Sequence, residues 1–463
     1  MICLAPKRTA RQPPYGTENQ RPTGRRSVTG DRSPTRSRGR GLNRESGIGD
    51  RQEIRRSGDQ ESDGIGKSLR RTAHRSGSLP GMTTPPSVPG LELSRRFHLE
   101  AVRPLLEEAA PGIPYSAALL GSGSEVLGFD TARSLDHEWG PRLQIFLHPR
   151  DVARHGAVLS KLLSERLPKR FHGYPTHFAA TSEAGIRVMR ATDGPVHHGV
   201  DITDPGTWFT ERLGFDPRQE VALTDWLATP TQRLAEVTAG AVFHDGLGEL
   251  APARAKLDWY DHDLWLHLLA CQWRRVSQEE AFVGRCGEVG DELGSAVVCA
   301  RLVRDLMRLC LLMDRRYPPY AKWLGSAFAR TPQAPALTPV LTAALAATDR
   351  NTREHHLARA YETVATAHNR LGLTEPVDPA TRPYHSRPFR VLHAERFAAA
   401  LLDRITDPVV RGLPPIGAVD QFVDSTDVLG HPESAREATR ATTALRRAAD
   451  RPGGGPSGPT PPV

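Results

Sequence analysis

The sequence predicts an α+β protein, in which a small mixed sheet with flanking helices is followed by a helical bundle. Between residues 91 and 225, segments with a helical spacing of apolar residues alternate with short apolar runs bounded by Gly, Pro and Asp. This alternation is typical of helices and strands that pack around one sheet. After residue 225 the apolar residues keep a helical spacing, with Pro-rich connections between segments, so we expect only helices there.

The expected elements follow one another in a regular order. In the first part we expect helices at Leu91–Ala110 and Val152–Leu167, and strands at Ala117–Leu120, Leu143–Leu147, Thr176–Ala180, Ile186–Arg190 and Gly199–Thr203. In the second part we expect helices at Leu264–Val276, Asp291–Met313, Val340–Thr348, Arg353–Leu371, Val391–Ile405 and Ala435–Ala449. We therefore divide the chain into a disordered arm (1–90), a sheet domain (91–225), a helical domain (226–430) and a C-terminal helix with a disordered tail (431–463).

Basic residues are concentrated at the N-terminus. Residues 1–81 contain 18 Lys and Arg against 8 Asp and Glu, a net charge of +10, whereas the whole chain carries +8, so the remainder carries −2. The Arg-, Ser-, Gly- and Pro-rich composition of this arm predicts disorder. A basic arm can bind nucleic acid through phosphates, but solvated arms are more common. Met82, just before the first helical segment, is an alternative start that would leave the arm outside the native protein.

Several classes of protein are excluded by the composition. The chain has no apolar run long enough to span a membrane and no apolar stretch of the kind that a secretory signal needs, so we expect a cytoplasmic protein without a membrane partner. Its five cysteines show neither a CxxC motif nor the Cys/His spacing of a zinc site, and we expect reduced thiols. The oligomeric state is left open.

A Gly-Ser turn follows the first predicted strand. Gly121, Ser122, Gly123 and Ser124 come directly after the apolar run, and glycine allows backbone angles that other residues avoid. A turn of helix at Ser124–Leu127 would direct free N–H groups toward the glycines, where a phosphate could bind. We therefore expect these four residues to bind nucleotide phosphates. The alternative is a strand-to-helix turn without a ligand.

Asp136 and Glu138 are separated by one residue. In an extended segment both carboxylates would project from the same face and could bind Mg²⁺ or Mn²⁺, which prefer oxygen ligands. A solvated pair, or one held by Arg133 or Arg142, is the alternative.

Transfer of a group to a hydroxyl also requires a base, for which a third carboxylate is suited. Asp201 is our candidate, because it lies on a predicted strand that could bring it to the same edge as the acid pair. Asp193 and Asp204 are close in sequence and could serve instead.

A basic and aromatic cluster follows the helix predicted at 291–313. It contains Arg315, Arg316, Tyr320 and Lys322, and its cations could reach phosphates. We take Lys322 as a further nucleotide-binding candidate. The alternative is that these cations stabilise the C-terminal end of the helix dipole.

The order of these residues resembles the nucleotidyltransferase superfamily, which includes aminoglycoside nucleotidyltransferases and polymerase-beta-like enzymes. The resemblance lies in Gly123-Ser124, eleven further residues, and then Asp136-His137-Glu138. More narrowly, a family of domains of unknown function in that superfamily is similar to three stretches: GSGSEVLGFDTARSLDHEWGPR from Gly121, RRYPPYAKW from Arg315 and LPPIGAVDQFVDSTDVL from Leu413. The resemblance implies that the Gly-Ser turn contacts a triphosphate, the acid pair binds magnesium and a later acid is the base.

We therefore hypothesise that the chain transfers a nucleoside monophosphate from a nucleoside triphosphate to the hydroxyl of an unidentified acceptor, with magnesium at Asp136 and Glu138. Two features depart from the superfamily pattern. His137 occupies a position that is usually apolar, and Trp139-Gly140-Pro141 interrupts the expected strand. The alternative is accordingly a protein that kept the fold, lost catalysis and binds a nucleotide or another ligand.

Overall fold

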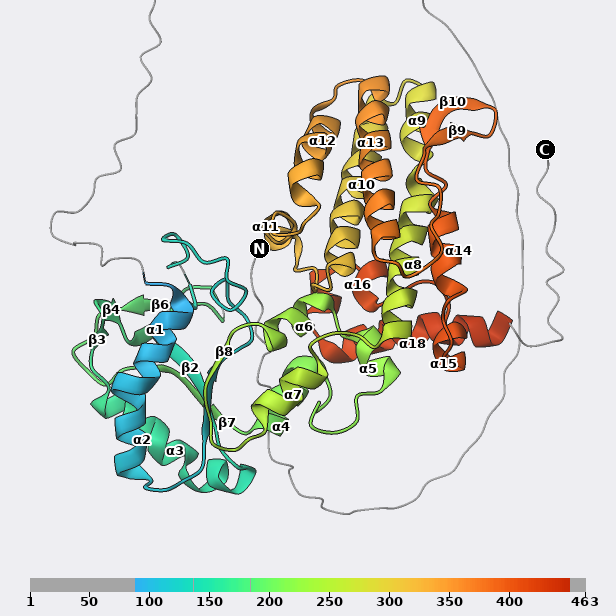
Figure 1. Cartoon of the computed structure of the whole chain (residues 1–463). Helices are drawn as coiled ribbons and strands as arrows, with labels where there is room; N and C mark the ends of the chain where they lie inside the picture. The colour runs from blue at the N-terminus through green and yellow to red at the C-terminus, as the bar shows by residue number, and fades with distance from the viewer. Residues whose placement is uncertain (1–87, 136, 184, 450–463) are drawn as a thin grey trace, which may run out of the picture. The chain divides into compact units, whose positions relative to one another are not determined.

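A computed structural model describes residues 88–135, 137–183 and 185–449, with the backbone alone for 443–449. It confirms the α+β fold, in which a small mixed sheet precedes a helical region (Figure 1). Nearly all of the predicted arm, the tail after residue 449 and Asp136 lie outside the described residues.

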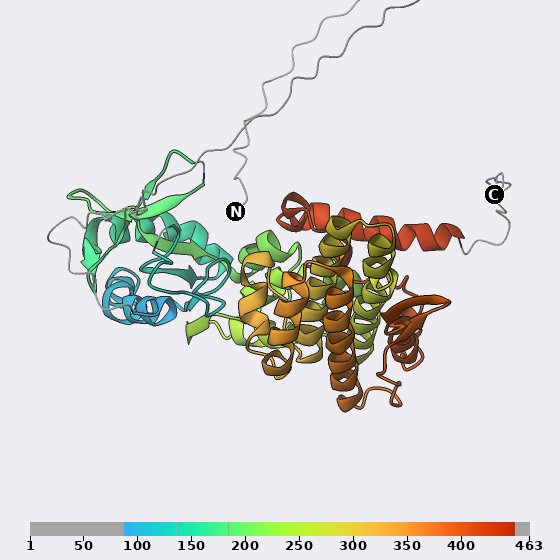
Figure 2. The same cartoon turned by 90° about the horizontal axis from the view of Figure 1, so that it is seen from above.

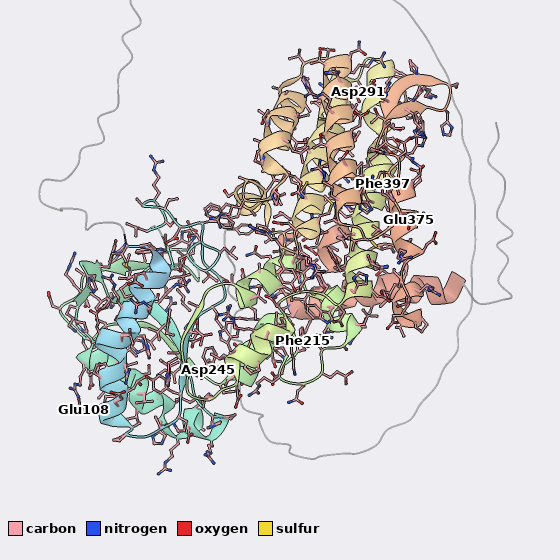
Figure 3. All side chains as sticks on the ribbon, viewed as in Figure 1. Glu108, Phe215, Asp245, Asp291, Glu375 and Phe397 are labelled. Carbon is pink, nitrogen blue, oxygen red and sulfur yellow. The ribbon has the colours of Figure 1, made fainter. Side chains whose placement is uncertain are left out.

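The central sheet has the strand order β7-β2-β1-β8. Its strands are β1 (Ser116–Leu119), β2 (Arg142–Phe146), β7 (Gly199–Thr203) and β8 (Ala241–Asp245). β1 runs antiparallel to β2 and β8, whereas β2 and β7 are parallel, so the sheet is mixed as predicted. Asp245, labelled in Figure 3, ends β8 and accepts a hydrogen bond from Ser116 Oγ at 2.7 Å.

β8 corrects the expectation that everything after residue 225 is helical. The strand lies between Gly240, whose φ of +72° favours glycine, and a turn at Gly248 with φ +69°. Its five residues include one His and one Asp, and so lack the continuous apolar run that identified the other strands. The sheet therefore extends beyond the predicted domain boundary.

The two faces of the sheet belong to different cores. Ala117, Leu143 and Ile145 face a core with the helices α1 (Gly90–Phe97), α2 (Arg103–Ala109) and α3 (Pro149–Arg166). Ala118 and Phe146 face the opposite way, into the large core shared with the helical region. Because side chains alternate along a strand, Arg142 and Gln144 of β2 also lie on this second face.

One π-helical turn, η1 (His98–Val102), joins α1 to α2. The Arg103 N–H donates to the carbonyl of His98, five residues earlier. Pro104 follows and has no N–H, so a regular α-helix would leave a carbonyl unpaired and close to the proline ring. The wider turn accommodates Pro104 within the helix predicted at 91–110.

Among the residues that the structure describes, three hairpins lie outside the central sheet. They are β3–β4 (Arg170–Phe171 and Tyr174–Pro175), β5–β6 (His177–Ala180 and Arg187–Arg190) and β9–β10 (Arg382–Tyr384 and Arg387–Val391). The strands predicted at 176–180 and 186–190 are confirmed, but they pair with each other and not with the central sheet. β9–β10 interrupts a region that we expected to be helical, and the helix predicted from Val391 begins at Glu395.

The rest of the described chain is mainly helical. The helices of the bundle are α8 (His262–Glu279), α10 (Glu292–Met313), α12 (Ala334–Ala346), α13 (Arg350–Arg370) and α14 (Glu395–Leu402), and α18 (Pro432–Ala449) follows near the C-terminus. The other helices are α4 (Pro205–Leu213), α5 (Leu223–Ala228), α6 (Thr231–Thr238), α7 (Leu250–Lys256), α9 (Phe282–Glu288), α11 (Ala321–Phe328), α15 (Pro408–Arg411), α16 (Val419–Phe422) and α17 (Thr426–Leu429).

The long helices form a bundle (Figures 1 and 2). α10 packs against α8 and α13, α14 against α8, and α12 against α13. Trp273 and Phe397 are stacked in its core with ring centroids 4.7 Å apart, and the Leu and Trp side chains of α8 are buried. Within the described ranges, no helix has both the length and the apolar character that crossing a membrane requires.

Candidate ligand-binding site

The Gly-Ser turn leaves β1 at the centre of the sheet and is held from two sides. The Gln144 side chain bonds both backbone groups of Leu120: its Oε1 accepts from the N–H at 3.0 Å, and its Nε2 donates to the carbonyl at 3.2 Å. The Gly121 N–H donates to the carbonyl of Glu236 on α6 at 2.8 Å. The turn is therefore fixed between β2 and α6.

Two arginines lie against the turn. Arg142 donates to the Ser122 carbonyl at 2.6 Å and is ion-paired with the buried Glu125. A Cβ atom on Gly121 would lie 2.9 Å from Nη1 of Arg212, and its φ of +88° also favours glycine. Burial lowers the pKa of Arg212, while attraction by Glu236 and Asp201 acts in the opposite direction. Both glycines of the turn are favoured by a positive φ, +88° at Gly121 and +150° at Gly123, and Arg142 lies against Gly123 as Arg212 lies against Gly121.

The carboxylate of Glu138 is hydrogen-bonded to a neighbouring arginine. Arg187 on β6 donates to Oε1 from its backbone N–H and Nε, both at 3.1 Å, and to Oε2 from Nη2 at 2.9 Å. The φ of Glu138 is +49°, so this residue is not in the extended conformation expected for the acid pair. Its partner in the predicted metal site, Asp136, lies outside the described residues.

Asp201 lies where the sequence predicted a strand. It is on β7 directly beside Gln144 of β2, and its exposed side chain shares the second face of the sheet with Gln144. Asp204, the alternative base, caps α4 by accepting from the Thr207 N–H at 3.0 Å. Asp193 is exposed in the connection between β6 and β7.

Lys322 lies at the start of α11 and is exposed, with its Nζ 5.0 Å from the ring centroid of Trp323. Its neighbours Tyr320 and Ala321 line a cavity, but Lys322 is not among the lining residues. Of the predicted nucleotide-binding residues, Ser122 lines this cavity.

The cavity has a volume of about 360 Å³ and brings together segments that are far apart in sequence. Its wall comprises Ser122 of the turn, residues of α6, Arg304 and Arg308 of α10, the Pro318–Leu324 segment and the segment from Asp420 to His431. Small-molecule sites usually have volumes of about 300–1,000 Å³. All three stretches that carried the family resemblance therefore meet at one cavity.

Polar residues at the start of α6 connect the walls. The Thr231 hydroxyl lies 2.7 Å from the Pro318 carbonyl and 2.5 Å from Asp420 Oδ2, and its one proton can be donated to either. Gln232 accepts from the Tyr320 N–H at 2.9 Å. Arg233 donates to Glu236 at 2.9 Å and to the Gly430 carbonyl at 3.0 Å. These bonds hold the Pro-rich segment and the C-terminal segment in place around the cavity.

The charged residues of the wall are only partly paired. Arg308 forms a buried ion pair with Asp420 at 2.7 Å, and Arg233 is paired with Glu236. The Arg304 side chain, in contrast, has no hydrogen bond or ion pair with any residue that the structure describes. Burial and the neighbouring Arg308 lower the pKa of Arg304, while Asp305 and Asp424 act to raise it. An unpaired, partly buried guanidinium on a cavity wall can bind an anionic group.

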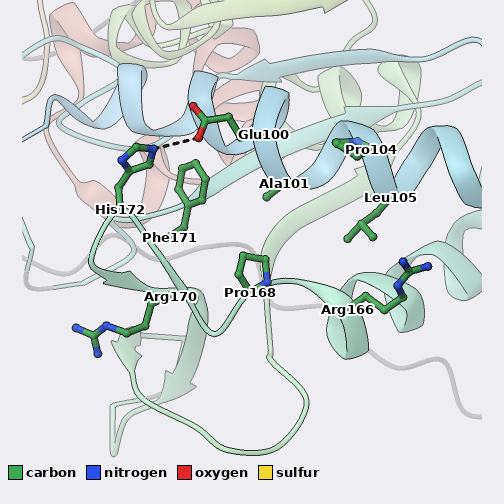
Figure 4. A pocket seen from close by; sticks show the side chains of 9 residues that line it. All are labelled: Glu100, Ala101, Pro104, Leu105, Arg166, Pro168, Arg170, Phe171 and His172. Atoms are coloured by element: carbon green, nitrogen blue, oxygen red, sulfur yellow. Dashed lines mark hydrogen bonds and ion pairs between the residues drawn. The ribbon is translucent and has the colours of Figure 1, made fainter.

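A second, more open hollow of about 530 Å³ lies beside η1 (Figure 4). Its charged side chains are paired with each other or with residues nearby. His172 lies 3.2 Å from Glu100, and Arg166 is bonded to Glu108 at 2.5 Å. It therefore offers fewer free polar groups than the cavity at Ser122.

Sequence reasoning did not identify Thr231, Arg304, Arg308 or Asp420 as site residues. Each lies on a helix, and apart from Arg304 and Arg308 on α10 they are separated by long stretches, so no local spacing marks the set. The stretches beginning at Arg315 and Leu413, which carry the family resemblance, were the available signal. Asp420 itself is within the second of these stretches.

Comparison with known proteins gives a partial match. The family model described as domain of unknown function (DUF4037) matches residues 226–324, which include α6, α10 and the Pro318–Leu324 wall. A crystal structure titled nucleotidyltransferase-like protein, from Exiguobacterium sibiricum, is 13% identical and covers 66% of this chain and 89% of its own, with a TM-score of 0.27. At that TM-score the match does not establish a shared fold. No curated protein matches the chain.

Proposed function

We propose that the chain binds a phosphorylated small molecule, with a nucleotide as the first candidate, in the cavity between Ser122 and Asp420. One observation carries the proposal. Ser122 of the Gly-Ser turn and the unpaired Arg304 line the same cavity. A phosphate provides oxygen acceptors for a guanidinium and for backbone N–H groups.

The structure around the turn is suited to an anion. Arg142 and Arg212 lie against Gly123 and Gly121, so the turn is surrounded by cations even though Glu125 neutralises Arg142. Binding of phosphate by Arg304 would supply the partner that this guanidinium lacks in the described part of the chain.

Transfer of a nucleoside monophosphate to an acceptor hydroxyl is a second candidate function. It is favoured by the position of Asp201, which lies beside Gln144, the residue that holds the start of the Gly-Ser turn. Within this proposal Asp201 would accept the proton of the hydroxyl.

The described residues do not fit a magnesium ion as they stand. Both carboxylate oxygens of Glu138 are bonded to Arg187, and no group of three or more His, Cys, Asp or Glu residues that could hold a metal occurs in the described ranges. We therefore assign Mg²⁺ no role in the proposed reaction. Dependence on Mg²⁺ or Mn²⁺ stays a prediction that rests on Asp136 and Glu138.

The binding proposal is tested by calorimetric titration of each of the four ribonucleoside triphosphates into wild type, R304Q and R301Q. Arg301 is a matched control, because it lies on the same helix but is exposed and already paired with Glu279 at 2.6 Å. Loss of one charge-assisted contact predicts about tenfold weaker binding for R304Q, with R301Q unchanged. Absence of binding by wild type, or equal affinities for all three proteins, would refute the proposal.

The transfer reaction is tested separately with radiolabelled nucleoside triphosphates and a cell extract. We expect D201N to bind nucleotide like wild type but to label no acceptor. Equal labelling by D201N would exclude Asp201 as the base.

A further inference from the structure

The two carboxylate oxygens of Asp420 have very different surroundings. Oδ2 lies within hydrogen-bond distance of three donors: Thr231 Oγ1 at 2.5 Å, Arg308 Nη2 at 2.7 Å and the Thr231 N–H at 3.3 Å. Oδ1 is also buried, yet it has no hydrogen-bond partner among the residues that the structure describes. The residue as a whole is 7% exposed and lines the cavity.

Asp420 cannot turn to find a partner for Oδ1. Its helix, α16, is held by Gln421, which donates to the Leu268 carbonyl at 3.0 Å and to Gln272 at 3.1 Å. The same side chain accepts from the Ala418 N–H at 3.0 Å. With the backbone fixed in this way and Oδ2 bonded to Arg308 and Thr231, the position of Oδ1 is determined.

An acceptor left without a donor in a buried position destabilises the folded protein. Natural proteins leave few such groups without a reason, and a ligand that brings its own donor is one such reason. We infer that Asp420 Oδ1 accepts a hydrogen bond from a hydroxyl or protonated amine of the ligand. This inference rests on the proposed function, since it describes a second contact of the phosphorylated molecule placed at Ser122 and Arg304.

The cavity wall thus carries two chemically distinct kinds of group. Ser122 and Arg304 can bind an anionic group, whereas Asp420 offers an oxygen acceptor. The ligand class that satisfies both groups is a phosphate ester that also carries a hydroxyl or an amine.

The inference can be tested with three small phosphate esters that differ in one terminal group: ethyl phosphate, ethylene glycol monophosphate and phosphoethanolamine. Their terminal groups are CH₃, OH and NH₃⁺. We expect wild type to bind the hydroxyl or the amine compound about tenfold or more tightly than ethyl phosphate, because a hydrogen bond to a charged acceptor is among the stronger ones. The tighter of the two identifies the donor.

D420N provides the variant test. Because Arg308 and Thr231 donate to Oδ2, the amide oxygen of Asn should take that place and direct its NH₂ group to where Oδ1 was. The preference for a donor-bearing probe should then disappear. D427N, an exposed residue on the same wall, is the control and should keep the preference.

The outcomes separate the two proposals. Equal binding of all three esters by wild type overturns the inference and leaves the phosphate site intact, and it would mean that water satisfies Oδ1. Failure of all three to bind refutes the proposed function and this inference with it. The affinities of the three esters for wild type test the inference even if D420N does not fold.

Discussion

Two carboxylates of this chain, Glu138 and Asp420, are each paired with an arginine, but they differ in whether a carboxylate oxygen is left without a hydrogen-bond partner. Glu138 uses both oxygens on Arg187, and its side chain is 35% exposed. Asp420 uses one oxygen on Arg308 and Thr231, is buried, and has its second oxygen without a partner in the described part of the chain.

The comparison shows why a motif and a binding group need not coincide. Glu138 lies in the motif that resembles a metal site, yet both of its carboxylate oxygens already accept hydrogen bonds from Arg187. Asp420 is not among the residues that the resemblance assigns a role, yet it lines a cavity that Ser122 of the Gly-Ser turn also lines.

Removing each carboxylate should give the largest contrast. D420A leaves Arg308 buried without its ion-pair partner, and we expect a loss of about 3–5 kcal/mol in the free energy of unfolding. E138A exposes Arg187 to solvent and should cost less than about 1 kcal/mol. Denaturant unfolding monitored by circular dichroism measures both. Similar losses for the two variants would contradict the contrast between a buried and an exposed pair.

The same contrast between buried and exposed groups predicts a dependence on pH. His98 is buried, with its Nε2 3.1 Å from the Tyr115 hydroxyl, and burial together with the nearby His244 lowers its pKa to about 4. The unfolded chain takes up this proton near pH 6.5, so the stabilisation is present above pH 6.5 and is lost as the pH falls toward 4. The loss should be on the order of 1–3 kcal/mol.

Unfolding curves from pH 7 to pH 4 measure this effect. H98Q should flatten the dependence on pH. H172Q, which alters an exposed histidine beside Glu100, should leave it as in wild type. An unchanged slope in H98Q would show that other groups dominate acid destabilisation.

The elements of the sheet domain were largely predictable, because strands β1 and β2 bury side chains on both faces and so appear in the sequence as apolar runs. β8 was not, since its mixed residues are held in place by pairing with β1 and not by their own pattern. The bundle helices were also predictable, because apolar residues recur at helical spacing on their buried faces.

The candidate site was only partly predictable. Ser122 and its neighbours are adjacent in sequence, so their spacing shows the turn directly. The cavity wall depends on how α6, α10 and α16 pack, and tertiary contacts of that kind leave no local signal. Glu138 likewise has a left-handed backbone and pairs with Arg187, more than forty residues away in sequence, and its local sequence indicates neither feature.

A glycine substitution tests the role of the Gly-Ser turn. G121A should destabilise the protein more than G112A. Both glycines have a positive φ, +88° and +74°, which costs about 1–2 kcal/mol for an L side chain. Only Gly121 lies against Arg212, whereas a Cβ on Gly112 would meet nothing within 4 Å. Thermal unfolding compares the two, and nucleotide affinity should fall in G121A alone. Equal effects would show that the approach of Arg212 is not important.

The smallest effect concerns the ion pair at Glu138 and the metal prediction that depends on it. A double-mutant cycle with E138Q and R187Q should give a coupling below about 1 kcal/mol that decreases with salt, because the pair is partly exposed.

If Asp136 and Glu138 bind Mg²⁺ after release of Arg187, then the ion should stabilise R187Q more than wild type and should not stabilise E138Q. Thermal unfolding with and without Mg²⁺ distinguishes these cases, and identical curves for all three proteins would remove the acid pair from the candidate site.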